Sequence, residues 1–301
     1  MLLKNIWLKL TNRQEYQKQK ILNLRNKIVV EYKSKYEPEL KKIRQKIKNQ
    51  SELNFLHSGH AADIVNVLPV IKELSKKHKC NLIINLNKKV KNYYKHPAGK
   101  YYLNEKIFNM LYPLLNNQTY LNKVERYSNQ NIDINFDILR SLPINLLFDN
   151  STYASIITGV KPDLSEMFIE APHHKELKGK IIIQRTFRYR NDLIDYTFLN
   201  KFNDLFFVGT FEEFKDLKNV VKNLNFYDCK DFLDMASVVK SSKFVIANSS
   251  ITFPLAEGLH VPRLLESSPD FPAAQPHGFN AYNFYFQSDF EELVNNLSNQ
   301  N

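Results

Sequence analysis

The sequence has little cysteine and little glycine. It contains 2 Cys, Cys80 and Cys229, which lie far apart and form no Cys-x-x-Cys pair. This excludes a disulfide framework and a structural zinc site, and it favours a reducing, cytoplasmic compartment. With only 7 Gly in 301 residues, we expect each glycine where the backbone requires one.

Long apolar runs are also missing. No stretch approaches the roughly 18 uncharged apolar residues that a transmembrane helix needs. Lys4 and Lys9 lie within the apolar run at the N-terminus, so we expect no cleavable secretory signal.

The common catalytic and cofactor signatures are absent too. The sequence has no GxGxxG, no GxxxxGK[ST], no HExxH and no GxSxG. It also has no Asp-x-Asp pair of the kind that holds a metal-bound nucleotide sugar. We therefore expect no cofactor and no metal site. Any phosphate group would have to be neutralised by protein cations and helix ends.

What is present is a globular composition with an uneven charge. Hydrophobic residues make up 43% and charged residues 24%, enough for two medium domains or one large domain. Residues 1–50 hold 14 Lys plus Arg against 4 Glu, so they carry +10 of the net +11. A basic patch of this density attracts anionic partners, either a nucleic-acid phosphate backbone or anionic lipid.

The same fifty residues have helical periodicity. Their apolar side chains recur at gaps of three and four, which predicts one stripe along a helix; the stripe is Ile21, Leu24, Ile28, Tyr32, Tyr36, Leu40, Ile43 and Ile47. Thr11 with Gln14 predicts a capping-box start, and Pro38 predicts a split into two helices. We expect a helical hairpin that packs its stripe on the body of the protein.

From residue 51 the pattern becomes α/β. A short strand at 53–56, a helix at 61–77 broken at Pro69 and a strand at 82–84 form a βαβ unit. A second series has strands at 180–184, 205–208 and 244–247, with helices at 231–240, 253–259 and 289–297. The sequence predicts two Rossmann-like domains, 51–160 and 179–301, joined by a linker at 161–178 and preceded by the basic extension 1–50. Their strand ends would face each other across a cleft.

The first candidate loop is HSGHAAD, residues 57–63, at the end of the first strand. Gly59 permits close backbone approach, and Asp63 falls in the first turn of the next helix, facing the cleft. A carboxylate there can take a proton from an attacking hydroxyl. Alternatively, Asp63 only complements the helix dipole. His57 and His60 are either ligand donors or solvated and capping residues.

The second loop is QRTFRYRN, residues 184–191. Arg185, Arg188 and Arg190, with the hydroxyl of Thr186, form a cationic group suited to phosphate oxygens. In an extended segment Arg188 and Arg190 would share one face, with Tyr189 opposite. The alternative is an exposed loop held by salt bridges.

The third stretch is residues 247–266. Asn248, Ser249 and Ser250 follow a buried strand, and a helix begins near Thr252. Hydroxyl residues there are either N-caps or part of a diphosphate site. Glu257 and Gly258 leave a polar face for a ribose. A further strand-end turn at 207–210 is followed by an acid at position 212.

These loops resemble the GT-B glycosyltransferases, and among them the ADP-heptose heptosyltransferase-like group. Three stretches are similar to that family's motifs: HSGHAADIVNVLPVIKEL, IIIQRTFRYRN and FVIANSSITFPLAEGLHVPRLLE. With the GTFEE turn they cover about 60 residues in the family's order. Ala62 stands where the family has glycine, Asn248 where an acid is common, and Pro254 where a histidine is common. Residues 95–150, where acceptors bind in the family, match none of its motifs.

The resemblance implies roles for individual residues. Asp63 matches the catalytic base, and Glu212 matches an acid near the donor's base or ribose. The implied donor-binding residues are Arg185, Thr186, Arg188, Arg190, Gly209, Thr210, Glu212, Asn248, Ser249, Ser250 and Glu257, and the acceptor loop is His57, Ser58, Gly59 and His60. The hypothesis is a metal-independent, inverting glycosyltransferase that uses a nucleoside diphosphate sugar as its donor.

The acceptor stays open at this point. One version is a surface or lipid-linked glycan, with the basic helices resting on an anionic membrane at its inner face. Another is a hydroxymethylated DNA base, as in phage DNA-modifying glycosyltransferases, with the helices on the phosphate backbone. The alternative from another class is a non-catalytic GT-B-like module that binds nucleic acid or membrane through its basic helices.

Overall fold

Two parallel sheets form the body of the protein. The computed structural model describes residues 2–90, 96–141, 149–271 and 273–300, with side chains from residue 6 onward. The first sheet has the order β3-β2-β1-β4 and all its neighbours are parallel. Its strands are β1 (Glu52–His57), β2 (Lys79–Ile84), β3 (Lys123–Arg126) and β4 (Ile134–Asn135). We call the part built on this sheet the N-terminal domain.

The second sheet has the order β10-β9-β8-β5-β6-β7 and is again parallel throughout. Its strands are β5 (Ile181–Gln184), β6 (Leu205–Val208), β7 (Asn225–Tyr227), β8 (Phe244–Ala247), β9 (Arg263–Glu266) and β10 (Ala281–Phe284). The helices of this C-terminal domain are α7 (Phe211–Lys218), α8 (Phe232–Ser241), α9 (Thr252–Leu259) and α10 (Gln287–Asn299). The predicted class, α/β with two Rossmann-like domains, is confirmed. The exact boundaries at residues 50, 160 and 178 stay a prediction.

The N-terminal domain contains α4 (Ala61–Ser75), α5 (Glu105–Asn116) and α6 (Tyr153–Thr158), with 3-10 turns at Phe136–Ser141 and Asn150–Thr152. The predicted break at Pro69 is wrong, because α4 runs through it as one helix. Buried residues on both sides of the proline, among them Leu68 and Ile71, hold the helix against the sheet. Their packing outweighs the hydrogen bond that the proline removes.

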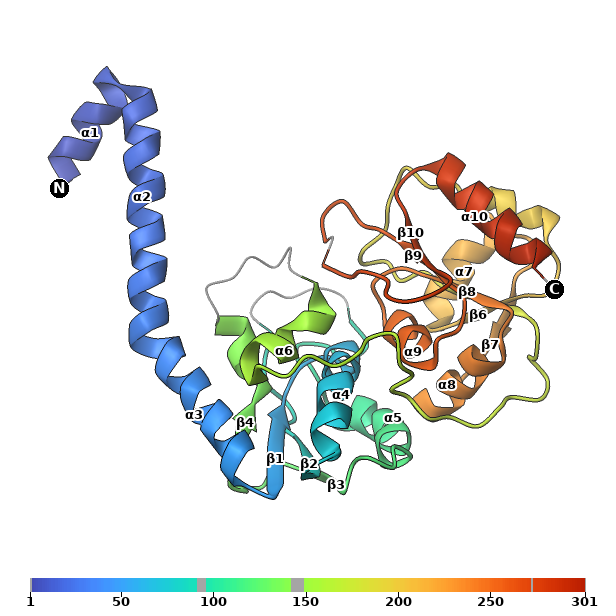
Figure 1. Cartoon of the computed structure of the whole chain (residues 1–301). Coiled ribbons are helices and arrows are strands. Elements are labelled where there is room, and N and C mark those ends of the chain that lie inside the picture. The colour runs from blue at the N-terminus through green and yellow to red at the C-terminus, as the bar shows by residue number, and fades with distance from the viewer. Residues whose placement is uncertain (1, 91–95, 142–148, 272, 301) are drawn as a thin grey trace.

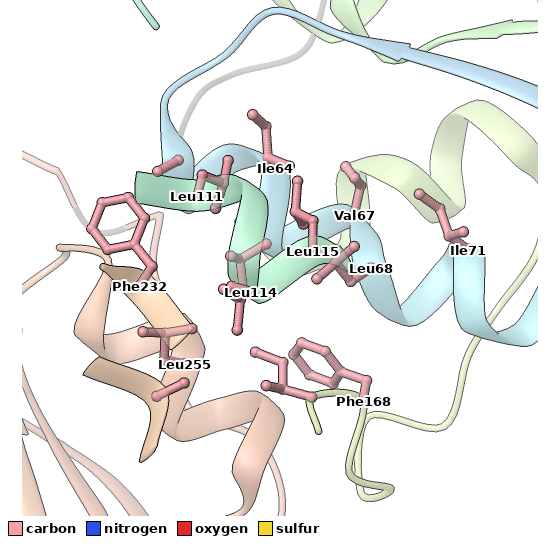
Figure 2. Close-up of a cluster of buried hydrophobic side chains, with 14 of the residues drawn as sticks. Ile64, Val67, Leu68, Ile71, Leu111, Leu114, Leu115, Phe168, Phe232 and Leu255 are labelled. Atoms are coloured by element: carbon pink, nitrogen blue, oxygen red, sulfur yellow. The ribbon is translucent and has the colours of Figure 1, made fainter. Parts of the chain in front are cut away.

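One hydrophobic cluster spans both domains, and a second lies within the C-terminal domain. Figure 2 shows Leu111 and Leu114 of α5 close to Phe232 of α8 and Leu255 of α9, with Phe168 beside them. Contacts join α5 to α8 and α4 to α9. The segment predicted as a linker takes part: the Phe168 and Ile169 amides both donate to the Gly258 carbonyl, at 2.9 and 3.0 Å. The domains are therefore packed on each other through apolar side chains.

The basic N-terminal segment forms a projecting arm. Helices α1 (Leu2–Thr11) and α2 (Arg13–Glu31) are followed by a π-helical turn (Tyr32–Tyr36) and α3 (Glu37–Asn49). Figure 1 shows α2 extending away from both sheets, with α1 at its outer end. Among the described residues, no helix is long and apolar enough to cross a membrane.

Two expectations about this segment are wrong. The chain reverses at Asn12, whose side chain accepts from the Glu15 amide at 3.0 Å, and not at Pro38, which lies in the first turn of α3 where a proline fits. The apolar stripe packs on the body only from Tyr36 onward. Ile21 and Leu24 are 51% and 58% exposed, because α2 extends beyond the body.

Candidate functional site

The candidate loops lie where the strand order of each sheet reverses. In the first sheet, β1 lies between β2 and β4, so the chain segments after β1 and β4 diverge there. In the second, β5 lies between β6 and β8, and the segments after β5 and β8 diverge likewise. Such switch points are the usual ligand sites of open α/β sheets. They predict a site built from residues 58–63, 136–141, 185–191 and 248–252.

A pocket lies between the domains, with an empty volume of about 760 Å³ that includes space open to solvent. Residues from both domains line it. From the N-terminal domain come His60, Asp63, Asn66, Asp149 and Ser151; from the C-terminal domain come Arg188, Tyr189, Ser249, Ser250, Phe253, Pro254, Glu257, Phe271, Gln275 and His277. The structure thus brings together Asp63, His60, Arg188, Ser249, Ser250 and Glu257 of the predicted site.

Asp63 lies in the first turn of α4, as predicted, and its side chain is 35% exposed. Its Oδ2 accepts from the His60 amide at 3.0 Å and from Nη2 of Arg140 at 2.8 Å. Burial raises the pKa of Asp63, but the positive charge of Arg140 and the neighbouring histidines outweigh it, so the pKa lies below its ordinary value. The carboxylate is therefore ionised at neutral pH.

Arg140 belongs to a charged network that the sequence did not reveal. Its Nη1 donates to Asp137 at 3.2 Å, and Lys88 donates to the same carboxylate at 2.9 Å. The amide and hydroxyl of Ser58 also donate to Asp137. Asp137 and Arg140 directly follow β4, so their position after a strand at the switch point was the available signal.

The predicted acceptor loop is mainly structural in its first three residues. His57 and Ser58 are fully buried, and Nδ1 of His57 accepts from the Gly59 amide at 2.9 Å. Burial lowers the pKa of His57 to about 4, so the ring is neutral at pH 7. A Cβ on Gly59 would lie 2.5 Å from Arg140 and 2.6 Å from Asp63, so a larger residue there would displace these two side chains. His60 is the loop histidine that lines the pocket.

The three arginines after β5 point in different directions. Arg185 donates from Nε and Nη2 to the buried Glu266, at 2.8 and 2.9 Å. Arg190 donates from Nη1 to Asp216 of α7 at 2.6 Å. Arg188 lines the pocket. The expectation that Arg188 and Arg190 share one face is wrong, because Tyr189 has a φ of 73° and interrupts the alternation.

Asn248 connects the two loops at the switch point. Its Oδ1 accepts from the amide and hydroxyl of Thr186 at 3.2 and 3.1 Å. Its Nδ2 donates to the carbonyls of Thr186 and Tyr189 at 3.0 and 3.3 Å. Asn248 is itself fully buried, so it holds the loop instead of facing the pocket.

Two polar groups at the start of α9 already form hydrogen bonds within the protein. The amide of Thr252 donates to Oε1 of Gln184 at 3.1 Å, and the hydroxyl of Ser250 donates to the Asn248 carbonyl at 3.2 Å. Ser250 therefore does not cap the helix; Ile251 occupies that position without a side-chain bond. Ser249 and Ser250 still line the pocket beside this helix end.

Other predicted donor residues lie around the next strand or face inward. Thr210 caps α7 together with Glu213, and the adjoining Gly209 has a φ of 140°. Glu212 is exposed in the first turn of α7. Gly209, Thr210 and Glu212 do not line the pocket. Glu257 lines it but accepts from Arg263 and from the His277 amide. Ile169 and Phe168 pack closely over Gly258, so the predicted polar face there is apolar.

Solved structures have the same arrangement of two domains. Similar ones are a glycosyl transferase family 9 protein from Veillonella parvula (TM-score 0.50, 10% identity, 81% of this chain and 91% of that chain) and the E. coli heptosyltransferase WaaC with ADP-2-deoxy-2-fluoro heptose (TM-score 0.54, 9% identity, 81% and 99%). WaaC with ADP gives a TM-score of 0.50 at 8% identity, over 82% and 99%. The fold is the GT-B fold. At these identities the likeness shows the fold alone. No family model and no curated protein sequence matches the chain.

Within this GT-B fold, one contact across the pocket was not predicted. Nε2 of His277, in the loop between β9 and β10, lies 2.7 Å from Oδ2 of Asp149 in the N-terminal domain and 3.1 Å from Oγ of Ser151. The bond to Asp149 raises the pKa of His277, and burial only partly offsets this. The pair joins the two domains at the pocket. The two residues are 128 positions apart, so no local pattern indicates it.

Proposed function

We propose that this protein is a glycosyltransferase that moves a sugar from a nucleoside diphosphate donor to an acceptor hydroxyl. The observation that carries the proposal is the meeting of Asp63 and Ser249–Ser250 in one pocket. Asp63 comes from the first turn of α4 and the serines from the start of α9, so a proton acceptor and a helix N-terminus face the same space from opposite domains. Acceptor activation needs the first, and diphosphate binding needs the second.

The proposed reaction is a single displacement. The acceptor hydroxyl gives its proton to Asp63 while its oxygen attacks the anomeric carbon. The bond from that carbon to the β-phosphate oxygen breaks, and its electron pair leaves with the nucleoside diphosphate. Arg188 and the start of α9 stabilise the developing negative charge. Attack opposite to the leaving group inverts the anomeric configuration, and we expect no metal ion in this step.

Donor binding tests the proposal first. Thermal unfolding of the full chain is measured with UDP, ADP, GDP and CDP, without metal and with Mg²⁺. We expect one nucleotide to raise the unfolding temperature without metal, since binding to the folded state alone stabilises it. No rise with any nucleotide in folded protein would overturn the proposal. Binding without transfer to any acceptor would favour the non-catalytic GT-B-like module.

For the acceptor, we propose a glycan carried on an anionic membrane, and the arm supports this choice. Ile6, Trp7 and Leu10 of α1 are 50%, 63% and 82% exposed. Residues 1–50 also carry a net charge of +10. Exposed apolar residues beside many lysines are typical of helices that lie in a lipid interface. Contact with a DNA backbone would need the lysines but not the apolar side chains.

Trp7 provides the measurement for this choice, because it is the single tryptophan of the chain. Its emission should shift to the blue with phosphatidylglycerol vesicles and not with phosphatidylcholine vesicles. The variant Leu10→Ser should bind the anionic vesicles less tightly, whereas Phe279→Ser, at an 85% exposed position far along the chain, should bind them as the wild type does. Binding to duplex DNA with a steep salt dependence, and none to vesicles, would favour the DNA acceptor.

A further inference from the structure

Tyr189 has an uncommon backbone conformation beside the pocket. Its φ of 73° lies in the left-handed region, which residues other than glycine rarely adopt. Such conformations persist only where surrounding bonds impose them, and they cluster at ligand sites. The conformation turns the chain between Arg188, which lines the pocket, and Arg190, which pairs with Asp216.

The bonds that impose this conformation come from Asn248. Its Nδ2 donates to the carbonyls of Thr186 and Tyr189, and its Oδ1 accepts from the Thr186 amide and hydroxyl. A carboxylate at this position could accept but not donate, so it could not hold the Tyr189 carbonyl. This gives a physical reason for asparagine at position 248.

The result is a stack of three side chains in the pocket wall. The ring of Tyr189 packs on Phe271, with centroids 4.7 Å apart and an interplanar angle of 26°. The guanidinium carbon of Arg188 lies 4.3 Å from the centre of the Tyr189 ring. All three line the pocket together with Asp63 and Ser249.

The charge of Arg188 acts on the opposite wall as well. Burial lowers the pKa of His60, and Arg188 lowers it further. Burial and the charge of Arg188 also lower the pKa of His96, and the charge of His60 lowers it too. The guanidinium therefore lies where its field reaches the acceptor side, next to the predicted base Asp63. A cation therefore lines the same pocket as the helix end that would bind the diphosphate and the residue that would accept the proton.

We propose that Tyr189 is a positioning residue, whose ring, backed by Phe271, holds the Arg188 guanidinium at the donor's diphosphate. An aromatic face restrains a guanidinium by cation–π attraction and leaves the N–H groups at its edge directed outward. Two of these groups can then bind two phosphate oxygens. Tyr189 acts on the donor through Arg188. This inference rests on the proposed function.

A double-mutant cycle on nucleotide affinity tests the inference. The dissociation constant of the nucleoside diphosphate that stabilises the wild type is measured by calorimetry for Tyr189→Leu, Arg188→Gln and the double variant. Tyr189→Leu should weaken binding roughly 3- to 30-fold, the range expected for a cation–π contact. In the Arg188→Gln background the same change should alter the constant less than about twofold, because the contact is already lost.

Two further variants separate positioning from general damage. Tyr189→Phe keeps the ring and should bind nucleotide as the wild type does. Phe187→Leu removes a ring whose centre lies 4.7 Å from the guanidinium carbon of Arg190. Because Arg190 does not line the pocket, this change should leave the nucleotide affinity unchanged. Equal losses from Phe187→Leu and Tyr189→Leu would indicate loop damage and overturn the inference.

The remaining outcomes are also decisive. A Tyr189→Leu effect that persists in the Arg188→Gln background would show that the ring acts without the arginine, and would overturn the inference while the proposed function stands. Unchanged affinity in Tyr189→Leu would do the same. A folded wild type that binds no nucleoside diphosphate would overturn the proposed function itself, and the inference with it.

Discussion

Arg140 donates to Oδ2 of Asp63 at 2.8 Å, so the proposed base forms an ion pair in the protein. The two residues are 77 positions apart and come from the two segments that diverge at the switch point of the first sheet. The charge of Arg140 lowers the pKa of Asp63, so it keeps the carboxylate ionised and makes it a weaker base. Two predictions follow from its geometry.

The first concerns Asp63 itself. Asp63→Asn should reduce the rate of sugar transfer by about 10²- to 10⁴-fold, since an amide cannot take the acceptor's proton. Donor affinity should change little. The matched control is Glu73→Gln, a carboxylate on the same helix that pairs with Lys76 at the surface. Near-normal transfer by Asp63→Asn, with intact donor binding, would remove Asp63 as the base.

The second concerns Arg140. In the proposed reaction, transfer needs Asp63 without its proton, so activity should fall as the pH drops through the pKa of Asp63. Arg140→Gln removes the main cause that lowers this pKa, while burial continues to raise it. The acid limb of kcat/KM against pH should therefore move to higher pH. Arg126→Gln, at an exposed pair with Glu105, should leave the limb in place. A limb that stays or moves to lower pH in Arg140→Gln contradicts this prediction.

The third prediction compares the stability that the ion pairs of Arg185 and Arg190 contribute. Glu266 is fully buried and accepts from Arg185, from the Asn191 amide and from the Tyr196 hydroxyl. Glu266→Gln leaves the Arg185 charge buried and uncompensated, so the free energy of unfolding should fall by about 3–5 kcal/mol in urea titrations. Asp216→Asn breaks an ion pair whose carboxylate is 44% exposed and should cost about 0–1 kcal/mol. Equal losses would show that burial does not decide the difference.

The fourth prediction concerns His277 and pH. Asp149 and Glu257 raise the pKa of His277, while burial and Arg263 lower it, and the result is above 6.5. A raised folded-state pKa gives stability that is fully present below the ordinary value and is lost as the pH rises through the raised one. The difference in unfolding temperature between wild type and His277→Gln should therefore shrink as the pH rises from 6.5 through the raised pKa of His277.

His57 titrates with the opposite sign, because its pKa of about 4 means that stability is lost as the pH falls from 6.5. His57 is present in both the wild type and His277→Gln, so its effect cancels in the difference between their unfolding temperatures. Asp149→Asn should show the same narrowing as His277→Gln. A difference that grows with pH would contradict the prediction.

Local sequence patterns predicted the elements that position the site. Strands β1, β5 and β8 are short runs of apolar residues, and α4 and α9 begin directly after the loops that follow β1 and β8. β9 was missed as a strand because it begins with Arg263 and ends with Glu266, both buried and paired with other charges. Buried charges hide a strand from periodicity, which registers apolar side chains.

Most of the errors came from contacts between distant residues. Nothing next to Tyr189 indicates a left-handed conformation, since Asn248 imposes it from 59 positions away. The directions of Arg185 and Arg190 depend on Glu266 and Asp216, and these lie on other elements. The reversal at Asn12 is a local cap, but the capping pattern at Thr11 and Gln14 lies one position away from the bond that forms.

The apolar contact between the domains determines how the pocket can open. Helices α4 and α5 pack on α9 and α8 through large side chains (Figure 2). A swing about a hinge would expose this surface to water, whereas a slide of one helix pair along the other keeps most of it covered. Opening by shear would therefore cost less free energy than opening by a hinge. The rate of turnover would then be sensitive to the size of residues such as Leu114 and Leu255, which lie in that sliding surface.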